Sequence, residues 1–149
     1  MTEPKLYEVK ASITSESMAR SLAEIRNFKI QMDEPKSLGG TDRAPNPLDL
    51  FLAAHGRCLN YMSHYIAKEM GIVIKDLQID LEAALDPAKF SGLSTAPRAG
   101  YQSIKVTFKI GADATSEQLD RLLTAVKNRC PVSDNISNVT PIEFLCMRL

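Results

Sequence analysis

Two cysteines are the residues of this chain that are best suited to catalytic chemistry. Cys58 follows a run of small residues in a long apolar stretch, and Cys130 comes directly before Pro131. A thiol becomes a nucleophile when basic neighbours lower its pKa from about 8.5. His55, three residues before Cys58, shares its helical face, and Arg57 is adjacent to it. The residue types therefore allow a reactive thiolate at Cys58, although inert packing is the usual role of a cysteine in an apolar helix.

The second cysteine is expected at the end of a helix, where a proline turns the chain. The ring of Pro131 restricts the backbone and so directs the Cys130 thiol. Because Cys58 and Cys130 are 72 positions apart (130 − 58), only the fold could bring their sulfurs together. A third cysteine, Cys146, has Phe144 as its neighbour on one face of a predicted strand, and we expect it in the core.

Metal and hydrolase chemistry have weaker support in the sequence. His55 and His64 are nine positions apart and no CxxC or HExxH motif occurs, so we expect no metal site and no other cofactor. A cysteine hydrolase with His55 as its base would also need an orienting third group and an oxyanion donor, and the sequence indicates neither.

Composition narrows the class of protein. The 149 residues suit one domain (1–149), and 44% hydrophobic with 24% charged residues is typical of a globular chain. Eighteen basic and eighteen acidic residues cancel without a basic run, so we expect neither a nucleic acid nor a membrane as partner. No signal peptide or apolar stretch of about 20 residues is visible, which predicts a cytoplasmic protein. Three cysteines in a reducing compartment do not indicate a structural disulfide framework.

A long helix is expected to carry the first cysteine. Asn46 suits the N-cap, Pro47 the first helical position, and Asp49 can complete a reciprocal cap. The helix should run over residues 48–70 and end at Gly71. Since it is apolar around much of its circumference, we expect it at the centre of the domain or of a dimer.

The other predicted elements give the order ββ-α-ββ-α-β and an α+β fold. A hairpin is expected from residues 5–13 and 22–32, and strands 72–85 and 104–110 should pair with it. Thr115 begins a capping box for a second helix that ends near Cys130, and a last strand is expected over residues 142–147. The long connection 86–100 indicates no chemistry.

Three sequence blocks together resemble the OsmC/Ohr family. They are residues 33–42 (DEPKSLGGTD), residues 45–54 (PNPLDLFLAA) followed by Cys58, and residues 129–135 (RCPVSDN). Their order and spacing match, and the resemblance extends over essentially the whole chain. It implies an OsmC-like fold in which a long central helix is covered by antiparallel sheet, and an intertwined homodimer with active sites at the subunit interface.

The same resemblance implies a thiol-dependent reduction of organic hydroperoxides. Cys58 would be the peroxidatic residue that attacks the O–O bond and becomes a sulfenic acid. Cys130 would then resolve the sulfenic acid as a disulfide, which an external dithiol reopens; this dithiol is lipoyl-linked in the Ohr branch.

The sequence departs from the Ohr pattern beside the helix start. A glutamate is expected directly after the helix-start proline, and this chain has Leu48 there. Asp49 follows one residue later, but at about 100° per residue it lies nearly opposite Cys58, so we interpret Asp49 as a cap. The departure motivates an alternative function, a non-catalytic OsmC-like dimer that binds a small apolar or thiol-reactive ligand or senses redox state.

An arginine is expected to activate the Cys58 thiolate. Arg26 is the favoured residue and Arg20 the alternative, while Arg43 in the following loop is also open. Apolar and aromatic side chains on the cysteine's helix favour an apolar substrate, and the predicted pocket consists of Phe51, His55, Tyr61, Met62 and Tyr65.

Overall fold

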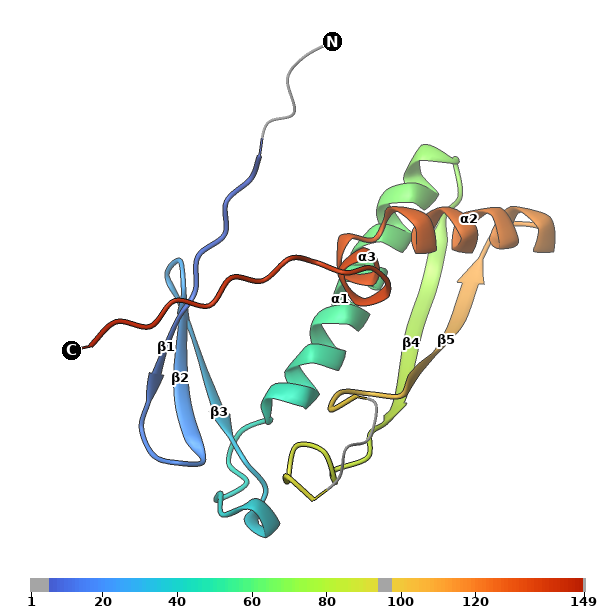
Figure 1. Cartoon of the computed structure of the whole chain (residues 1–149). Helices are drawn as coiled ribbons and strands as arrows, with labels where there is room; N and C mark the ends of the chain where they lie inside the picture. Colours follow the sequence, from blue (N-terminus) through green and yellow to red (C-terminus); the bar gives the residue numbers. More distant parts are fainter. Residues whose placement is uncertain (1–5, 94–97, 149) are drawn as a thin grey trace. The chain divides into compact units, whose positions relative to one another are not determined.

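The computed structural model describes residues 6–93 and 98–148 and has an α+β fold, as predicted (Figure 1). The chain divides into two compact units, Met1–Phe51 and Leu52–Leu149. The prediction of a single domain stays a prediction. In chain order the elements are β1 (Ser12–Ser15), β2 (Arg20–Ile25), β3 (Phe28–Asp33), the 3-10 helix η1 (Lys36–Leu38), α1 (Pro47–Glu69), β4 (Ile74–Ala84), β5 (Ser103–Ala112), α2 (Ser116–Arg129) and α3 (Pro131–Ser137).

The first unit contains a three-stranded antiparallel sheet in the order β1-β2-β3. The predicted strand 22–32 is wrong in one respect, because it is divided into β2 and β3 by a tight turn between Ile25 and Phe28. Arg26 enters this turn in the left-handed conformation, with φ 57°. The sequence held a signal that was missed, since the apolar spacing changes from two to three between Ile25 and Phe28 and Asn27 favours a turn, although no glycine or proline marks it.

The loop after β3 is organised by one buried carboxylate. Asp33 is 1% exposed, and it accepts hydrogen bonds from the Thr41 and Arg43 N–H groups and from the Thr41 hydroxyl. The Thr41 hydroxyl is the main reason that the pKa of Asp33 lies below its usual value. A Cβ atom on Gly40 would lie 1.7 Å from the carbonyl oxygen of Glu34, so only glycine fits this close approach.

Both ends of α1 follow the predicted signals. Asn46 Oδ1 accepts from the Asp49 N–H at 2.9 Å, and Asp49 Oδ2 accepts from the Asn46 N–H at 3.0 Å, which confirms Asp49 as a cap. The helix ends at Glu69, and Gly71 has φ 69°. The N–H of Ile72 then bonds the Ala67 carbonyl at 2.8 Å, as a left-handed C-terminal cap requires.

In the second unit β4 and β5 form an antiparallel ribbon of their own. Leu77 pairs with Ile110 and Leu81 with Val106, with a bulge near Ile74. The expectation that these strands pair with the hairpin is wrong within the described chain, which has two separate sheets. Alternation identifies the buried face of a strand, but it does not say which edge the strand joins.

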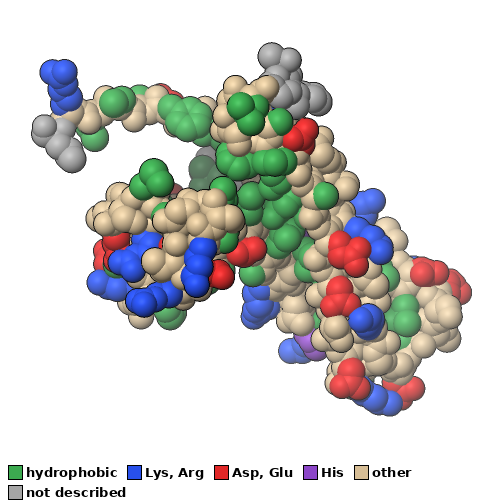
Figure 2. Space-filling view, turned by 90° about the horizontal axis from the view of Figure 1, so that it is seen from below, with side chains coloured by type: hydrophobic (Ala, Val, Ile, Leu, Met, Phe, Trp, Pro, Cys, Tyr) green, Lys and Arg blue, Asp and Glu red, His purple; other side chains and the backbone are tan. Residues whose placement is uncertain are grey.

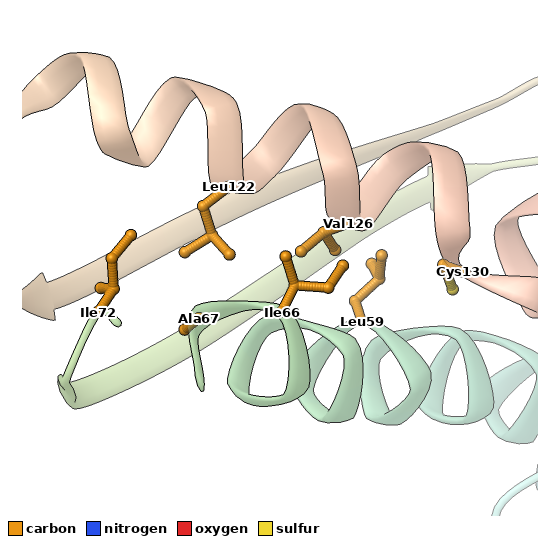
Figure 3. Close-up of a cluster of buried hydrophobic side chains, with 7 residues drawn as sticks. All are labelled: Leu59, Ile66, Ala67, Ile72, Leu122, Val126 and Cys130. Atoms are coloured by element: carbon orange, nitrogen blue, oxygen red, sulfur yellow. The ribbon is translucent and has the colours of Figure 1, made fainter. Parts of the chain in front are cut away.

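The core of this unit is formed by α1, α2 and the turn that follows α1. Figure 3 shows Leu122, Val126 and Cys130 of α2 and its end facing Leu59 and Ile66 of α1. The predicted capping box starts α2, since the Thr115 hydroxyl accepts from the Gln118 N–H at 3.2 Å and the Gln118 amide oxygen accepts from the Thr115 N–H at 2.8 Å. Packing of α2 along α1 therefore places Cys130 at one end of the core.

The C-terminal part differs from the prediction. Residues 131–137 form a short helix, α3, for which Cys130 is the N-cap and Pro131 the first residue. The strand predicted at 142–147 is wrong, because residues 138–148 have no helix or strand. Cys146 is exposed and not in the core, and Phe144 beside it is 88% exposed. A strand needs a partner edge, and the described residues supply none to this segment.

Charged side chains of both signs are interspersed over the face seen in Figure 2. Two cross-strand ion pairs join β4 and β5, Lys105–Glu82 at 3.2 Å and Lys109–Asp80 at 2.7 Å. Such exposed pairs contribute little stability. No helix in the described part of the chain is long and apolar enough to cross a membrane.

Candidate active site

Helix α1 positions Cys58 in its third turn beside the β4–β5 ribbon. The Cys58 side chain is partly buried, whereas three of the predicted pocket residues on this helix, Phe51, Tyr61 and Tyr65, are exposed. A Cβ atom on Gly56 would lie 2.8 Å from Leu81 Cδ1, so the small residue lets the helix approach β4 closely.

Cys130 is held at the junction of α2 and α3. Its side chain is only 1% exposed, and its sulfur accepts a hydrogen bond from the Ser133 N–H at 3.4 Å. In this position the sulfur replaces the side-chain oxygen that normally caps a helix. Pro131 at the first helical position fixes the turn, as the sequence indicated.

The fold brings the two cysteines into contact. The Sγ atoms of Cys58 and Cys130 are 3.2 Å apart, and both thiols are free. A disulfide has an S–S length of about 2.05 Å, so closure requires an approach of about 1 Å. Small rotations about the side-chain bonds of the two cysteines can bring the sulfurs together over this distance.

The surroundings shift the pKa values of the two thiols in opposite directions. Burial raises the pKa of Cys58, and the neighbouring Cys130 raises it further, while the Val132 N–H and the Arg57 charge oppose this only in part. Burial also acts to raise the pKa of Cys130, but hydrogen bonds from Ser133, from Cys58 and from the Val132 N–H together outweigh burial and lower it. A single negative charge on the pair is therefore favoured on Cys130.

His55 is linked to Cys130 instead of Cys58. It is 6% exposed, and its Nε2 lies 2.9 Å from the Ser133 hydroxyl oxygen. Burial lowers the pKa of His55, so the ring is neutral and supplies no positive charge to Cys58. The sequence reasoning missed Ser133; the signal was its place three residues after a cysteine that caps a helix.

The predicted pocket residues of α1 lie in different environments. Tyr61 and Tyr65 are half exposed and stacked, with ring centroids 6.0 Å apart. The Arg57 and Arg129 guanidinium groups lie over these two rings, each at 5.8 Å from a centroid. Met62 packs against the core instead. The two tyrosines thus offer an aromatic surface on the helix, and the pocket as a whole stays a prediction.

The predicted arginines and the remaining pocket residue belong to the first unit. Arg20 on β2 lies 3.6 Å from the Glu16 carboxylate, and the Arg26 guanidinium lies 5.1 Å from the centre of the Phe28 ring. Phe51, in the first turns of α1, is 41% exposed. Activation of Cys58 by Arg26 or Arg20 stays a prediction. Arg57, the basic neighbour of Cys58 in the sequence, is the arginine whose charge acts to lower the pKa of Cys58, but burial outweighs it and the pKa is raised.

Both site cysteines lie in a region of the chain that matches a known protein family. The model of the family described as OsmC-like protein matches residues 40–144, which include both site cysteines. No curated protein matches the chain.

Several solved structures are similar to the whole fold. An OsmC-like protein from Mycoplasma pneumoniae has a TM-score of 0.74 at 20% identity, covering 91% of this chain and 89% of that one. An organic hydroperoxide resistance protein OsmC from Legionella pneumophila has a TM-score of 0.62 at 21% sequence identity, and the match covers 89% of this chain and 91% of that one. An organic hydroperoxide resistance protein from Elizabethkingia anophelis has a TM-score of 0.64 at 20% sequence identity, and the match covers 87% of this chain and 88% of that one. At these identities the likeness establishes the fold.

Proposed function

Because the chain belongs to the OsmC-like family, we propose that it is a peroxidase that reduces organic hydroperoxides with the Cys58–Cys130 pair. The observation that carries the proposal is the distance of 3.2 Å between the two sulfurs. The family supports a redox role, and the similar proteins from Legionella and Elizabethkingia are described as hydroperoxide resistance proteins. Such an enzyme would serve the response to oxidative stress.

Cys58 is the peroxidatic residue in this proposal because it is the more accessible sulfur. A proton passes from the Cys58 thiol to the Cys130 thiolate across the 3.2 Å contact. The Cys58 thiolate then attacks the hydroperoxide, the O–O bond breaks, and Cys58 becomes a sulfenic acid. The alkoxide that leaves takes the proton from Cys130 and departs as the alcohol.

Cys130 is then a thiolate again, next to the sulfenic acid that it resolves. Its sulfur attacks the Cys58 sulfur, the S–O bond breaks, and hydroxide leaves and is protonated to water. An external dithiol, oxidised to its own disulfide, reduces the pair and completes the cycle. We propose the cytoplasm as the location of this cycle, because a reducing compartment supplies the dithiol that reopens the pair.

The aromatic surface on α1 supports an apolar hydroperoxide as substrate. Tyr61 lies three residues after Cys58 and therefore on the same helical face, and Tyr65 stacks on it. Their exposed rings can bind an alkyl or aryl group, whereas hydrogen peroxide would gain nothing from them.

A homodimer is the second part of the proposal. Apolar side chains of the C-terminal segment 139–147 are extensively exposed; they are Val139, Ile142, Phe144, Leu145 and Met147. Large exposed apolar side chains grouped in one segment are typical of an interface, and a second copy of the chain would bury them symmetrically. Light scattering of the full chain should give the mass of a dimer, and replacing Phe144 and Leu145 by Asp should give a monomer.

The function is tested with purified protein, cumene hydroperoxide and dihydrolipoamide. Cys58→Ser should abolish turnover, whereas Cys130→Ser should leave at most one turnover and accumulate the sulfinic acid of Cys58 in mass spectra. Cys146→Ser is the matched control and should keep full activity, because Cys146 is exposed and outside the pair. Retained turnover in Cys58→Ser would show that the roles are wrong.

A second candidate function is redox sensing or ligand binding without turnover. It is favoured by the raised pKa of Cys58, which makes this thiol a weaker nucleophile at neutral pH. A sensor would form the Cys58–Cys130 disulfide with an oxidant but would not consume hydroperoxide in repeated cycles. The turnover number with dihydrolipoamide separates the two functions.

A further inference from the structure

A line of hydrogen-bonding groups leads from a buried histidine to the second cysteine. His55 Nε2 lies 2.9 Å from Ser133 Oγ, and the Ser133 N–H lies 3.4 Å from Cys130 Sγ. The histidine and the cysteine are 6% and 1% exposed. The peroxidase cycle described above assigns no role to this histidine or to Ser133, although burying a polar ring has a free-energy cost that must be offset.

The protons of this line can be assigned from its geometry. His55 is neutral, and its Nδ1 has no hydrogen-bond partner among the described residues. With the ring proton on Nε2, Nδ1 has only a lone pair left to satisfy. Nε2–H then donates to Ser133 Oγ, which leaves the single hydroxyl proton of Ser133 for the Cys130 sulfur. The Ser133 N–H lies 3.4 Å from Cys130 Sγ, and the hydrogen bond from the Ser133 side chain is the largest of the effects that lower the pKa of Cys130.

We propose that His55 and Ser133 are positioning residues that hold Cys130 as the thiolate of the pair, so that Cys130 is the leaving group when an external thiol opens the disulfide. The inference rests on the proposed function only in that this disulfide is the one formed in catalysis. It assigns to each sulfur a distinct part in the reductive half of the cycle.

The chemistry of this step balances without a further reactant. The thiolate of the reductant attacks Cys58 Sγ, the Cys58–Cys130 bond breaks, and Cys130 leaves with the electron pair as a thiolate. The second thiol of the reductant then attacks its own mixed-disulfide sulfur, and Cys58 leaves as a thiolate and is protonated. A leaving thiol of lower pKa leaves faster.

Accessibility leads to the same direction of attack. Cys58 is partly exposed, whereas Cys130 is buried at the junction of α2 and α3. The lowered pKa of Cys130 and the raised pKa of Cys58 agree with this assignment. The positive charge of Arg57 acts on Cys58, whereas the groups that lower the pKa of Cys130 are the hydrogen-bond donors of Ser133, Cys58 and Val132.

The first test measures the direction of attack without any hydroperoxide. The Cys146→Ser protein is oxidised with diamide, mixed briefly with 2-mercaptoethanol, quenched with acid and alkylated, and its peptides are analysed by mass spectrometry. We expect the 2-mercaptoethanol adduct on Cys58 and the alkyl group on Cys130. An adduct mainly on Cys130 would overturn the inference.

The second test measures the effect of the two positioning residues on the same disulfide. Ser133→Ala and His55→Leu should slow its reduction by dithiothreitol about threefold for each unit by which the leaving thiol's pKa rises. His55→Gln, which can keep a donor near the Nε2 position, should restore most of the rate. Ser137→Ala on α3 and His64→Leu on α1 are exposed, matched controls and should react like the parent.

A direct titration separates this role from simple loss of structure. In a Cys58→Ser, Cys146→Ser background, ultraviolet absorbance against pH gives the pKa of Cys130 alone. Ser133→Ala should raise it by about one unit, the effect of losing one hydrogen bond to a charged group. An unchanged Cys130 pKa and an unchanged reduction rate in well-folded Ser133→Ala would refute the proposed role of Ser133. None of these three experiments measures hydroperoxide turnover, so failure of the peroxidase proposal would be seen separately.

Discussion

Closing the Cys58–Cys130 disulfide should stabilise the fold by several kcal/mol. The sulfurs are already 3.2 Å apart, so the bond forms without unfolding and with little native-state strain. It closes a loop of 72 residues (130 − 58). The chain-entropy relation gives about 15 cal/mol/K for such a loop, which corresponds to about 4 kcal/mol at 25 °C. The Ser133 N–H loses a charged acceptor, which offsets about 1 kcal/mol of this gain.

The assay compares the two redox forms of Cys146→Ser protein. After diamide treatment, intact mass should fall by about 2 Da as two thiol protons are lost, and urea unfolding should give a free energy larger by about 3–4 kcal/mol than the reduced form. For a domain of this size the melting temperature should rise by about 10 °C. Cys58→Ser and Cys130→Ser controls should show no change with oxidant. Equal stability of the two forms at full oxidation would refute the reasoning, because it would require strain or rearrangement that the contact distance does not indicate.

Three further predictions concern the fold that holds the site. Gly40→Ala should destabilise the protein by about 1–3 kcal/mol in urea unfolding, because its Cβ atom would meet backbone at 1.7 Å, while Gly100→Ala, with no atom nearer than 3.8 Å, should be near neutral. Leu122→Ala, at a fully buried position, should cost about 2–5 kcal/mol, and the exposed Leu93→Ala should change little. Asp33 has a pKa below 3.8 in the folded protein, so its contribution is present above that pH and is lost as pH falls through the folded value. The stability difference between wild type and Asp33→Asn should therefore shrink from pH 6 to pH 3, and a constant difference would contradict this.

Helix ends were predictable because their signals are local. The Asn46–Asp49 cap and the stop at Gly71 depend on residues within a few positions of one another, as does the capping box at Thr115. The same local reasoning could have found α3, since Pro131 and Asp134 are typical of a first turn. It was missed because a cysteine is not a usual N-cap.

Strand pairing was less predictable because it joins distant segments. In residues 22–32 only the wider spacing between Ile25 and Phe28 marks the turn at Arg26. The apolar residues of 142–147 resemble a strand, although the described residues offer this segment no partner edge. Alternation reports which side chains share a face. It carries no information on the neighbour that completes the ladder.

For the site, the sequence by itself determined that two cysteine blocks of one family are present, and where each lies in a helix or turn. Only the tertiary structure decided that the Cys58 and Cys130 sulfurs are 3.2 Å apart, and that His55 turns to Ser133 and not to Cys58. Which sulfur holds the charge also depended on the fold, because a thiol pKa follows burial and donated hydrogen bonds. The donors reach Cys130 from the first turn of α3, an element that the sequence reasoning did not include.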